Sequence, residues 1–205
     1  MEDILDLYEE PFDPKRPVVC LDEQPYQHLS DCIEPLAAQP GQSMREDYTY
    51  KRRGVCNFFM IFQPLGGWRH VKLTDRRTTL DYAQCLKDIV DLHFPEAEQI
   101  RVVQDNLNTH KFSALYEAFD PEEARRLVSK LEFHYTPKHA SWLDMAEIEF
   151  SALNRQCTQR RFSDRKTLAQ NIEAWERRRN QNNTTVKWKF TTRQARLKMK
   201  RAYPV

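Results

Sequence analysis

The sequence lacks long hydrophobic runs, closely spaced cysteine pairs and internal repeats. No apolar stretch approaches the roughly 20 residues that a membrane-spanning helix needs. The acidic opening MEDILDLYEEPFDPKRP also differs from the basic and apolar pattern of a secretory signal. The five cysteines are widely spaced and contain no CxxC pair, which argues against disulfides and structural zinc. We therefore expect a protein of the reducing cytoplasm with no membrane partner.

What the sequence does contain is an uneven distribution of charge. The 205 residues fit one domain, with room for an appendage. Residues 151–205 carry 15 Lys or Arg and 3 Asp or Glu, a net +12, whereas residues 1–150 carry 17 and 27, a net −10. A basic tail on an acidic body favours a polyanionic partner such as nucleic acid. The alternative is a solvated basic helix that binds nothing.

The order of hydrophobic patterns predicts an α/β fold with a mixed sheet. Strands alternate with helices, and a hairpin follows the first strand. The ribonuclease H-like fold has this order, although order alone does not establish it. We expect a flexible lead-in over 1–16, a five-stranded catalytic domain flanked by helices over 17–160, and a basic helical extension over 161–205. The expected strands are 18–22, 48–62, 68–73, 100–104 and 131–137, and the expected helices are 78–94, 112–130 (broken near 120–121), 141–156 and about 163–179.

Two predicted strands end in an aspartate. Val18–Leu21 lead directly into Asp22, and residues 100–104 lead into Asp105. Each aspartate alone is more simply read as a strand cap. In an open α/β sheet, however, ligands bind beyond the carboxyl ends of strands. If the two strands are neighbours, the carboxylates converge and repel unless a cation compensates them, and hard oxygen ligands favour Mg²⁺ or Mn²⁺.

A third carboxylate is expected on the helix that follows residue 140. Its candidates are Asp144, Glu147 and Glu149. Glu147 lies beside the apolar stripe of that helix, whereas Glu149 points farther round the helix from that stripe. An acidic residue that borders a core face is costly unless it binds something. Glu147 is therefore the preferred third ligand and Asp144 the second choice, although a surface position is the simpler interpretation of Glu147 alone.

Four segments together resemble a known family. The segments VVCLDEQP, LGGWRHVKLTDRRT, VVQDNLNTHK and HYTPKHASWLDMAEIEFS resemble DDE transposases of the bacterial insertion-sequence branch of the Tc/mariner superfamily. The resemblance runs from about residue 17 to the end of the chain. It implies a ribonuclease H-like catalytic domain that holds two Mg²⁺ ions, with Mn²⁺ as a substitute, on an Asp, Asp, Glu triad. The matching positions are Asp22, Asp105 and Glu147.

The resemblance also implies an activity and partners. The activity is cut-and-paste transposition, in which the enzyme cleaves DNA at transposon ends and joins them to target DNA. The expected partners are double-stranded DNA and further copies of the chain assembled on DNA, in the bacterial cytoplasm at the nucleoid. The rivals are another ribonuclease H-like nuclease and a non-catalytic DNA-binding or regulatory remnant of a transposase.

The sequence departs from the family pattern in two places. Between Asp105 and Glu147 lie 41 residues, more than in animal members, and the insertion FDPEEARRLVSKLEF looks helical. The family pattern also includes an N-terminal helix-turn-helix region that reads transposon ends, which we do not expect within these 205 residues. Because transposases of this branch are often split over two reading frames, we expect an upstream helix-turn-helix polypeptide as a partner.

Further residues are weaker candidates. Glu23 adjoins Asp22 but alternates to the other face of the strand, so a salt bridge is the simpler expectation. For Asn106, a role in orienting a water molecule or a phosphate and a plain position in a turn are equally good interpretations. For His139, contact with a phosphate or buffering of protons is as good an interpretation as a loop histidine without a role. For contact with DNA phosphates, the candidates are Arg177, Arg178 and Arg179.

Overall fold

The computed structural model describes residues 1–45, 47–107, 110–138 and 140–200. In this part of the chain, one five-stranded sheet has the order β3-β2-β1-β4-β5. β1 is antiparallel to β2 and parallel to β4, which in turn is parallel to β5. The expected mixed sheet is therefore confirmed. The strands are β1 (Val18–Asp31), β2 (Tyr50–Gln63), β3 (Trp68–Thr74), β4 (Ile100–Gln104) and β5 (Leu131–Tyr135).

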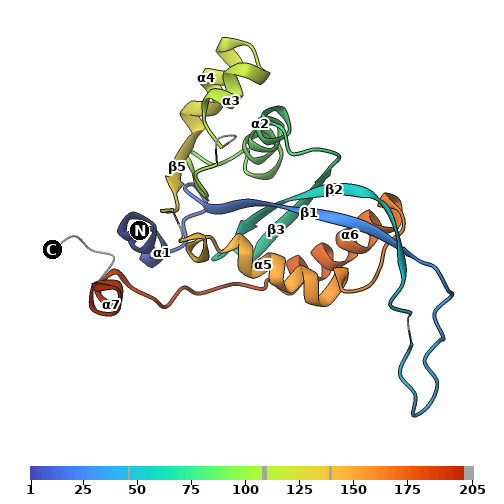
Figure 1. Cartoon of the computed structure of the whole chain (residues 1–205). Coiled ribbons are helices and arrows are strands. Elements are labelled where there is room, and N and C mark those ends of the chain that lie inside the picture. The colour runs from blue at the N-terminus through green and yellow to red at the C-terminus, as the bar shows by residue number, and fades with distance from the viewer. Residues whose placement is uncertain (46, 108–109, 139, 201–205) are drawn as a thin grey trace.

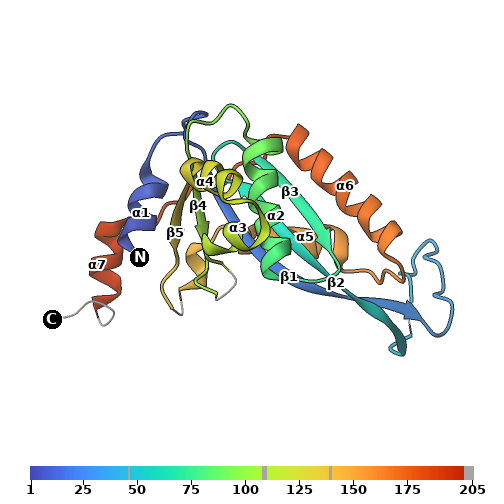
Figure 2. The same ribbon diagram turned by 90° about the horizontal axis from the view of Figure 1, so that it is seen from above.

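Helices cover both faces of the sheet (Figures 1 and 2). From residue 78 onward, their bounds follow the expected pattern, including the break before Pro121, which occupies the first turn of its helix. The α-helices are α1 (Glu2–Glu9), α2 (Thr79–Asp88), α3 (Ser113–Ala118), α4 (Pro121–Lys130), α5 (Ala146–Leu153), α6 (Arg165–Gln181) and α7 (Thr192–Lys198). A π-helical turn, Ile89–His93, extends α2, a 3₁₀ turn, Ser141–Leu143, precedes α5, and a second π-helical turn, Asn154–Thr158, follows α5.

The alternation of side chains along the central strand divides the core into two layers. Cys20 belongs to the hydrophobic cluster that α1, α5 and α6 cover, whereas Leu21 belongs to the cluster that α2, α3 and α4 cover. Burial on both faces explains why the middle of β2 is a continuous apolar run from Phe58 to Phe62. The same alternation sends Asp22 toward the α5 side and Glu23 toward the α2 side.

The expected helix start at Thr78 is confirmed. The Thr78 hydroxyl accepts from the backbone N–H of Asp81, and the Asp81 side chain accepts from the backbone N–H of Thr78. This capping box satisfies two helix-end donors. It sets the start of α2, which covers the face of the sheet toward which Glu23 points.

The terminal segments differ from the expectation of a loose lead-in. Residues 2–9 form α1, whose Ile4 and Leu5 are fully buried in the core. The prolines at 11, 14 and 17 end this helix without preventing it. An ion pair between Arg196 and Glu2 joins α7 to α1. The two ends of the described chain therefore lie side by side (Figures 1 and 2). Four apolar positions of α1 provide enough buried surface to order the lead-in.

The first strand is also longer than expected. β1 continues past Asp22 to Asp31 and pairs with β2 as far as Tyr50. The described residues between β1 and β2 therefore lie at the tip of a long hairpin that projects from the domain (Figure 1). None of the helices in the described ranges is long and apolar enough to span a bilayer.

Candidate active site and metal centre

Strand register brings together Asp22, which lies within β1, and Asp105, which directly follows β4. β1 and β4 are parallel neighbours, with Val19 beside Val102 and Cys20 beside Val103. Asp22 and Asp105 each lie two residues beyond Cys20 and Val103, so the same register places them beside one another. The convergence that the sequence predicted depends on the two strands being adjacent, and the sheet order meets that condition.

Helix α5 brings further carboxylates to the same place. Glu147 lies in the first turn of α5 and is half-buried. Asp144 precedes the helix, and its Oδ1 accepts a hydrogen bond of 2.9 Å from the backbone N–H of Ala146. Its Oδ2 is buried and has no hydrogen-bond partner within the described residues. Both carboxylates lie close enough to Asp22 for their charges to act on it or on one another.

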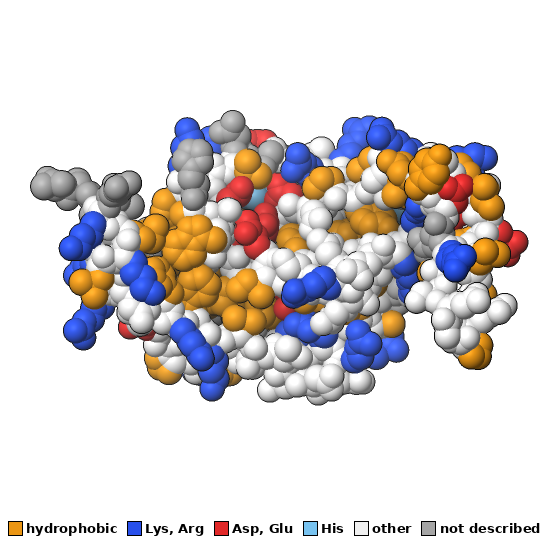
Figure 3. All heavy atoms as spheres, turned by 60° about the horizontal axis from the view of Figure 1, so that its bottom comes forward, with side chains coloured by type: hydrophobic (Ala, Val, Ile, Leu, Met, Phe, Trp, Pro, Cys, Tyr) orange, Lys and Arg blue, Asp and Glu red, His pale blue; other side chains and the backbone are white. Residues whose placement is uncertain are grey.

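Burial and neighbouring negative charges raise the proton affinity of Asp22 and Asp144. Burial raises the pKa of Asp22 to about 7, a hydrogen bond from the backbone N–H of Glu23 opposes this, and the charges of Glu23, Asp105 and Glu147 add to it. Burial, followed by the charge of Asp22, raises the pKa of Asp144 well above its ordinary value. Figure 3 shows acidic side chains gathered in one patch beside a hydrophobic area. The patch therefore has more negative charge than its surroundings neutralise.

The donor set fits a hard divalent cation. Asp22 uses Oδ1 to accept from the backbone N–H of Glu23, 2.8 Å away, and Asp105 uses Oδ1 to accept from the backbone N–H of Leu107, 3.3 Å away. The second oxygen of each carboxylate makes no hydrogen bond within the described part of the chain. Among the described residues, no three Asp, Glu, His or Cys side chains are already arranged to share one ion. Mg²⁺ keeps several of its waters and needs only one or two protein carboxylates, so the oxygen chemistry of this set suits Mg²⁺ or Mn²⁺.

A buried histidine links two of the carboxylates. Nδ1 of His110 lies 2.5 Å from Oδ1 of Asp105, and Nε2 lies 2.8 Å from Oε2 of Glu23. Burial lowers the pKa of His110, but the hydrogen bonds and charges of Asp105 and Glu23 outweigh it and raise the pKa to about 10. The salt bridge expected of Glu23 is thus present, with Arg77 as a second, more distant partner at 3.9 Å. Sequence reasoning missed His110, although it follows Asp105 by only five residues.

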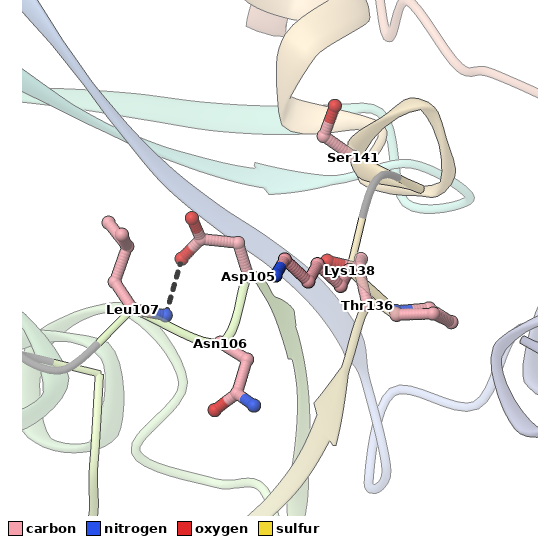
Figure 4. A pocket seen from close by; sticks show the side chains of 7 residues that line it. Asp105, Asn106, Leu107, Thr136, Lys138 and Ser141 are labelled. Atoms are coloured by element: carbon pink, nitrogen blue, oxygen red, sulfur yellow. Dashed lines mark hydrogen bonds between the residues drawn. The ribbon is translucent and has the colours of Figure 1, made fainter.

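A pocket of about 340 Å³ opens beside Asp105. Asn106 lines it and is exposed, and its amide points away from the carboxylate of Asp105 (Figure 4). Its suggested role in orienting water or phosphate stays a prediction. His139, the other polar candidate near this loop, lies outside the described residues. The remaining lining residues are Leu107, Thr136, Pro137, Lys138 and Ser141.

The three arginines proposed for DNA contact do not share one environment. Arg177 is exposed and pairs with Glu173 at 2.8 Å, and Arg178 is exposed. Arg179 instead points inward and binds Glu149 through two hydrogen bonds of 2.6 and 3.0 Å. A side chain committed to a buried carboxylate is not available to phosphates. The expectation for Arg179 is therefore corrected, whereas Arg177 and Arg178 remain candidates.

Glu149 is also placed differently from expectation. It is fully buried, and Oε1 lies 2.9 Å from Nε of the equally buried Arg69. The Arg69 guanidinium donates to the carbonyl oxygens of Gly67 and Thr184, and Oδ1 of Asn180 also accepts from it. This network ties β3, α5 and α6 together. It fixes α5, and hence Glu147, against the sheet.

Comparisons with known proteins agree with this architecture. Residues 17–169, more than half of the chain, match the family described as DDE superfamily endonuclease. The chain therefore belongs to the DDE superfamily of endonucleases, and the expected membership of this superfamily is confirmed. No curated protein matches the sequence significantly.

Solved structures of a mariner transposase share the fold. The Mos1 mariner paired-end complex with Mn and the Mos1 paired-end complex with the left transposon end each match with a TM-score of 0.60 and 14% identity, covering 89% of this chain and 55% of that chain. The Mos1 strand transfer complex matches with a TM-score of 0.59 and 13% identity, covering 89% and 56%. The chain thus has the ribonuclease H-like fold and spans about half the length of these relatives.

Proposed function

We propose that this chain is the catalytic domain of a cut-and-paste DNA transposase, with Asp22, Asp105 and Glu147 as its catalytic triad. The observation that carries the proposal is the convergence of three carboxylates, from within β1, just after β4 and at the start of α5, where burial and then the charges of its neighbours raise the pKa of Asp22. In a protein of the DDE endonuclease superfamily, such a surplus of negative charge is best explained by cation binding.

In this proposal, the triad holds two divalent ions, Mg²⁺ in the cell and Mn²⁺ as a substitute. When bound, these ions would activate a water molecule or a DNA 3′-hydroxyl and stabilise the leaving oxygen. The protein contributes carboxylate oxygens that backbone N–H groups already orient at Asp22 and Asp105. It also contributes a rigid base, because the Arg69–Glu149–Arg179 network fixes the helix that carries Glu147.

The proposed substrates are double-stranded DNA at transposon ends and at the target. The Mos1 structures are a paired-end complex with a transposon end and a strand transfer complex, and we extend this activity to the present chain on the strength of the shared fold and family. We further propose that the chain assembles as a homo-oligomer on DNA at the bacterial nucleoid. A helix-turn-helix polypeptide of the same element would supply recognition of the ends, because phosphate contacts alone do not discriminate sequence.

A two-stage assay tests the proposal. The chain, with its upstream helix-turn-helix polypeptide supplied, is incubated with Mn²⁺ and DNA that bears the element's ends. We expect nicking at the ends and joining of the 3′-hydroxyls to target DNA, both of which vanish in D22N. Nicking without joining would indicate another ribonuclease H-like nuclease. Metal-dependent DNA binding without nicking would indicate a non-catalytic remnant.

A further inference from the structure

Asp105 is held through only one of its two carboxylate oxygens. Oδ1 accepts from the backbone N–H of Leu107 and lies 2.5 Å from Nδ1 of His110. In Figure 4 the second oxygen points away from Leu107. Asp105 follows the end of β4, and its side chain is 33% exposed, so the strand itself does not fix its rotamer. The contacts to Oδ1 therefore determine where the second oxygen lies.

His110 is itself held rigidly. Its side chain is 1% exposed, the Tyr82 ring stacks on it with centroids 4.8 Å apart, and the carbonyl oxygen of His110 accepts from Nε2 of Gln104. The side chain of Glu23 is 4% exposed and contacts Nε2 of the imidazole. Glu23 lies on one face of β1, and Asp22 lies on the other. One strand thus supplies a triad carboxylate to one face and an anchor for His110 to the other.

We propose that His110, anchored by Glu23, is a positioning residue that fixes the carboxylate of Asp105 through Oδ1 and leaves Oδ2 for the metal ion. This inference rests on the proposed function, because it assumes that Asp105 is a metal ligand. Hydrogen bonds to ligating carboxylates orient the ligand before the metal arrives, and their loss weakens metal affinity by roughly 10–100-fold. Neither His110 nor Glu23 touches the metal or the DNA in this role.

Two substitutions of His110 separate its two nitrogens. The side-chain amide of asparagine reaches the position of Nδ1, so H110N keeps a donor for Asp105 and loses the contact with Glu23. The amide of glutamine reaches the position of Nε2, so H110Q keeps the contact with Glu23 and loses the contact with Asp105. Mn²⁺ affinity of the full chain without DNA, measured by electron paramagnetic resonance, should fall about tenfold in H110Q. It should stay near the wild-type value in H110N, and nicking should follow the same order.

The controls distinguish this inference from a loss of fold and from the proposed function. His70 also faces a carboxylate, at 3.1 Å from Glu176, but lies on β3 outside the site, so H70Q should bind Mn²⁺ like the wild type. Equal losses in H110N and H110Q, or none in H110Q, would overturn the inference. If H110Q does not fold, the variant E23Q tests the inference instead. Weaker Mn²⁺ binding by E23Q supports the anchoring of His110 by Glu23, and Mn²⁺ binding equal to that of the wild type refutes it. A wild-type chain that neither binds Mn²⁺ nor nicks DNA would defeat the proposed function and this inference together.

Discussion

Two glutamates, two residues apart on α5, have opposite environments. Glu149 is fully buried between Arg69 and Arg179, whereas Glu147 is half-buried among Asp22, Asp105 and Asp144, with no cationic partner within the described residues. A buried charge must be compensated. In the first cluster the protein supplies the compensation itself, and in the second the described residues leave negative charge that an added ion would compensate. The comparison therefore separates a network that holds the fold together from a cluster that fits the proposed metal site.

The largest effect should come from E147Q, which removes one charge from the uncompensated cluster. Nicking should fall about a thousandfold, or ~4 kcal/mol of transition-state stabilisation, because the reaction depends on electrostatic stabilisation. The melting temperature should not fall, since no cation of the described chain loses a partner. Nicking kinetics with Mn²⁺ and a thermal melt measure the two quantities. Nicking near the wild-type rate would remove Glu147 from the triad.

The matched change in the compensated cluster, E149Q, should act on stability. It leaves Arg69 buried without a full counter-charge, and breaking a buried pair in this way costs about 3 kcal/mol of unfolding free energy. Urea denaturation measures the loss. Nicking by the remaining folded protein should decline far less than in E147Q. A variant as stable as the wild type would show that the Arg69–Glu149–Arg179 network does not stabilise the fold.

A smaller effect is expected from D144N in the metal-free protein. Asp144 has a raised pKa in the folded state, so its contribution to stability is fully present below the unfolded pKa of about 4 and is lost as pH rises above it. Asparagine keeps the oxygen that accepts from Ala146 and cannot ionise. The variant should therefore melt higher than the wild type at pH 8, with a gap that narrows toward pH 5. A gap that does not change with pH would contradict the assignment of repulsion to this carboxylate.

The smallest effect concerns the exposed arginines. The double variant R177Q/R178Q should weaken DNA binding similarly for all sequences. It should also lower the slope of the logarithm of the binding constant against the logarithm of salt concentration by about 2, since each phosphate contact contributes about 0.9. R179Q should leave that slope unchanged and lower the unfolding free energy instead, because Arg179 pairs with buried Glu149. Binding titrations over a range of salt concentrations separate the two variants. An unchanged slope in the double variant would place the DNA path elsewhere.

Local patterns predicted the elements well but missed residues whose environment depends on distant contacts. The run before Asp22 gave a strand and the Thr78 pattern gave a helix start, because both follow from neighbours in the sequence. Arg179 looked like its neighbours Arg177 and Arg178, yet it faces a buried glutamate 30 residues away. No local signal distinguishes the three arginines, since the direction of each depends on how α6 packs.

By itself, the sequence determined the order of the elements, the mixed sheet and the aspartate that follows β4, because hydrophobic periodicity and strand termination are local properties; it placed the end of β1 too early, at Asp22. Its four family segments also pointed to Glu147. The tertiary structure alone decided that β1 and β4 are neighbours, that His110 joins Asp105 to Glu23, and that Glu149 is neutralised while Glu147 is not. Each of these depends on groups far apart in the chain that meet at low solvent exposure, where the balance of charge is set by packing and not by sequence spacing.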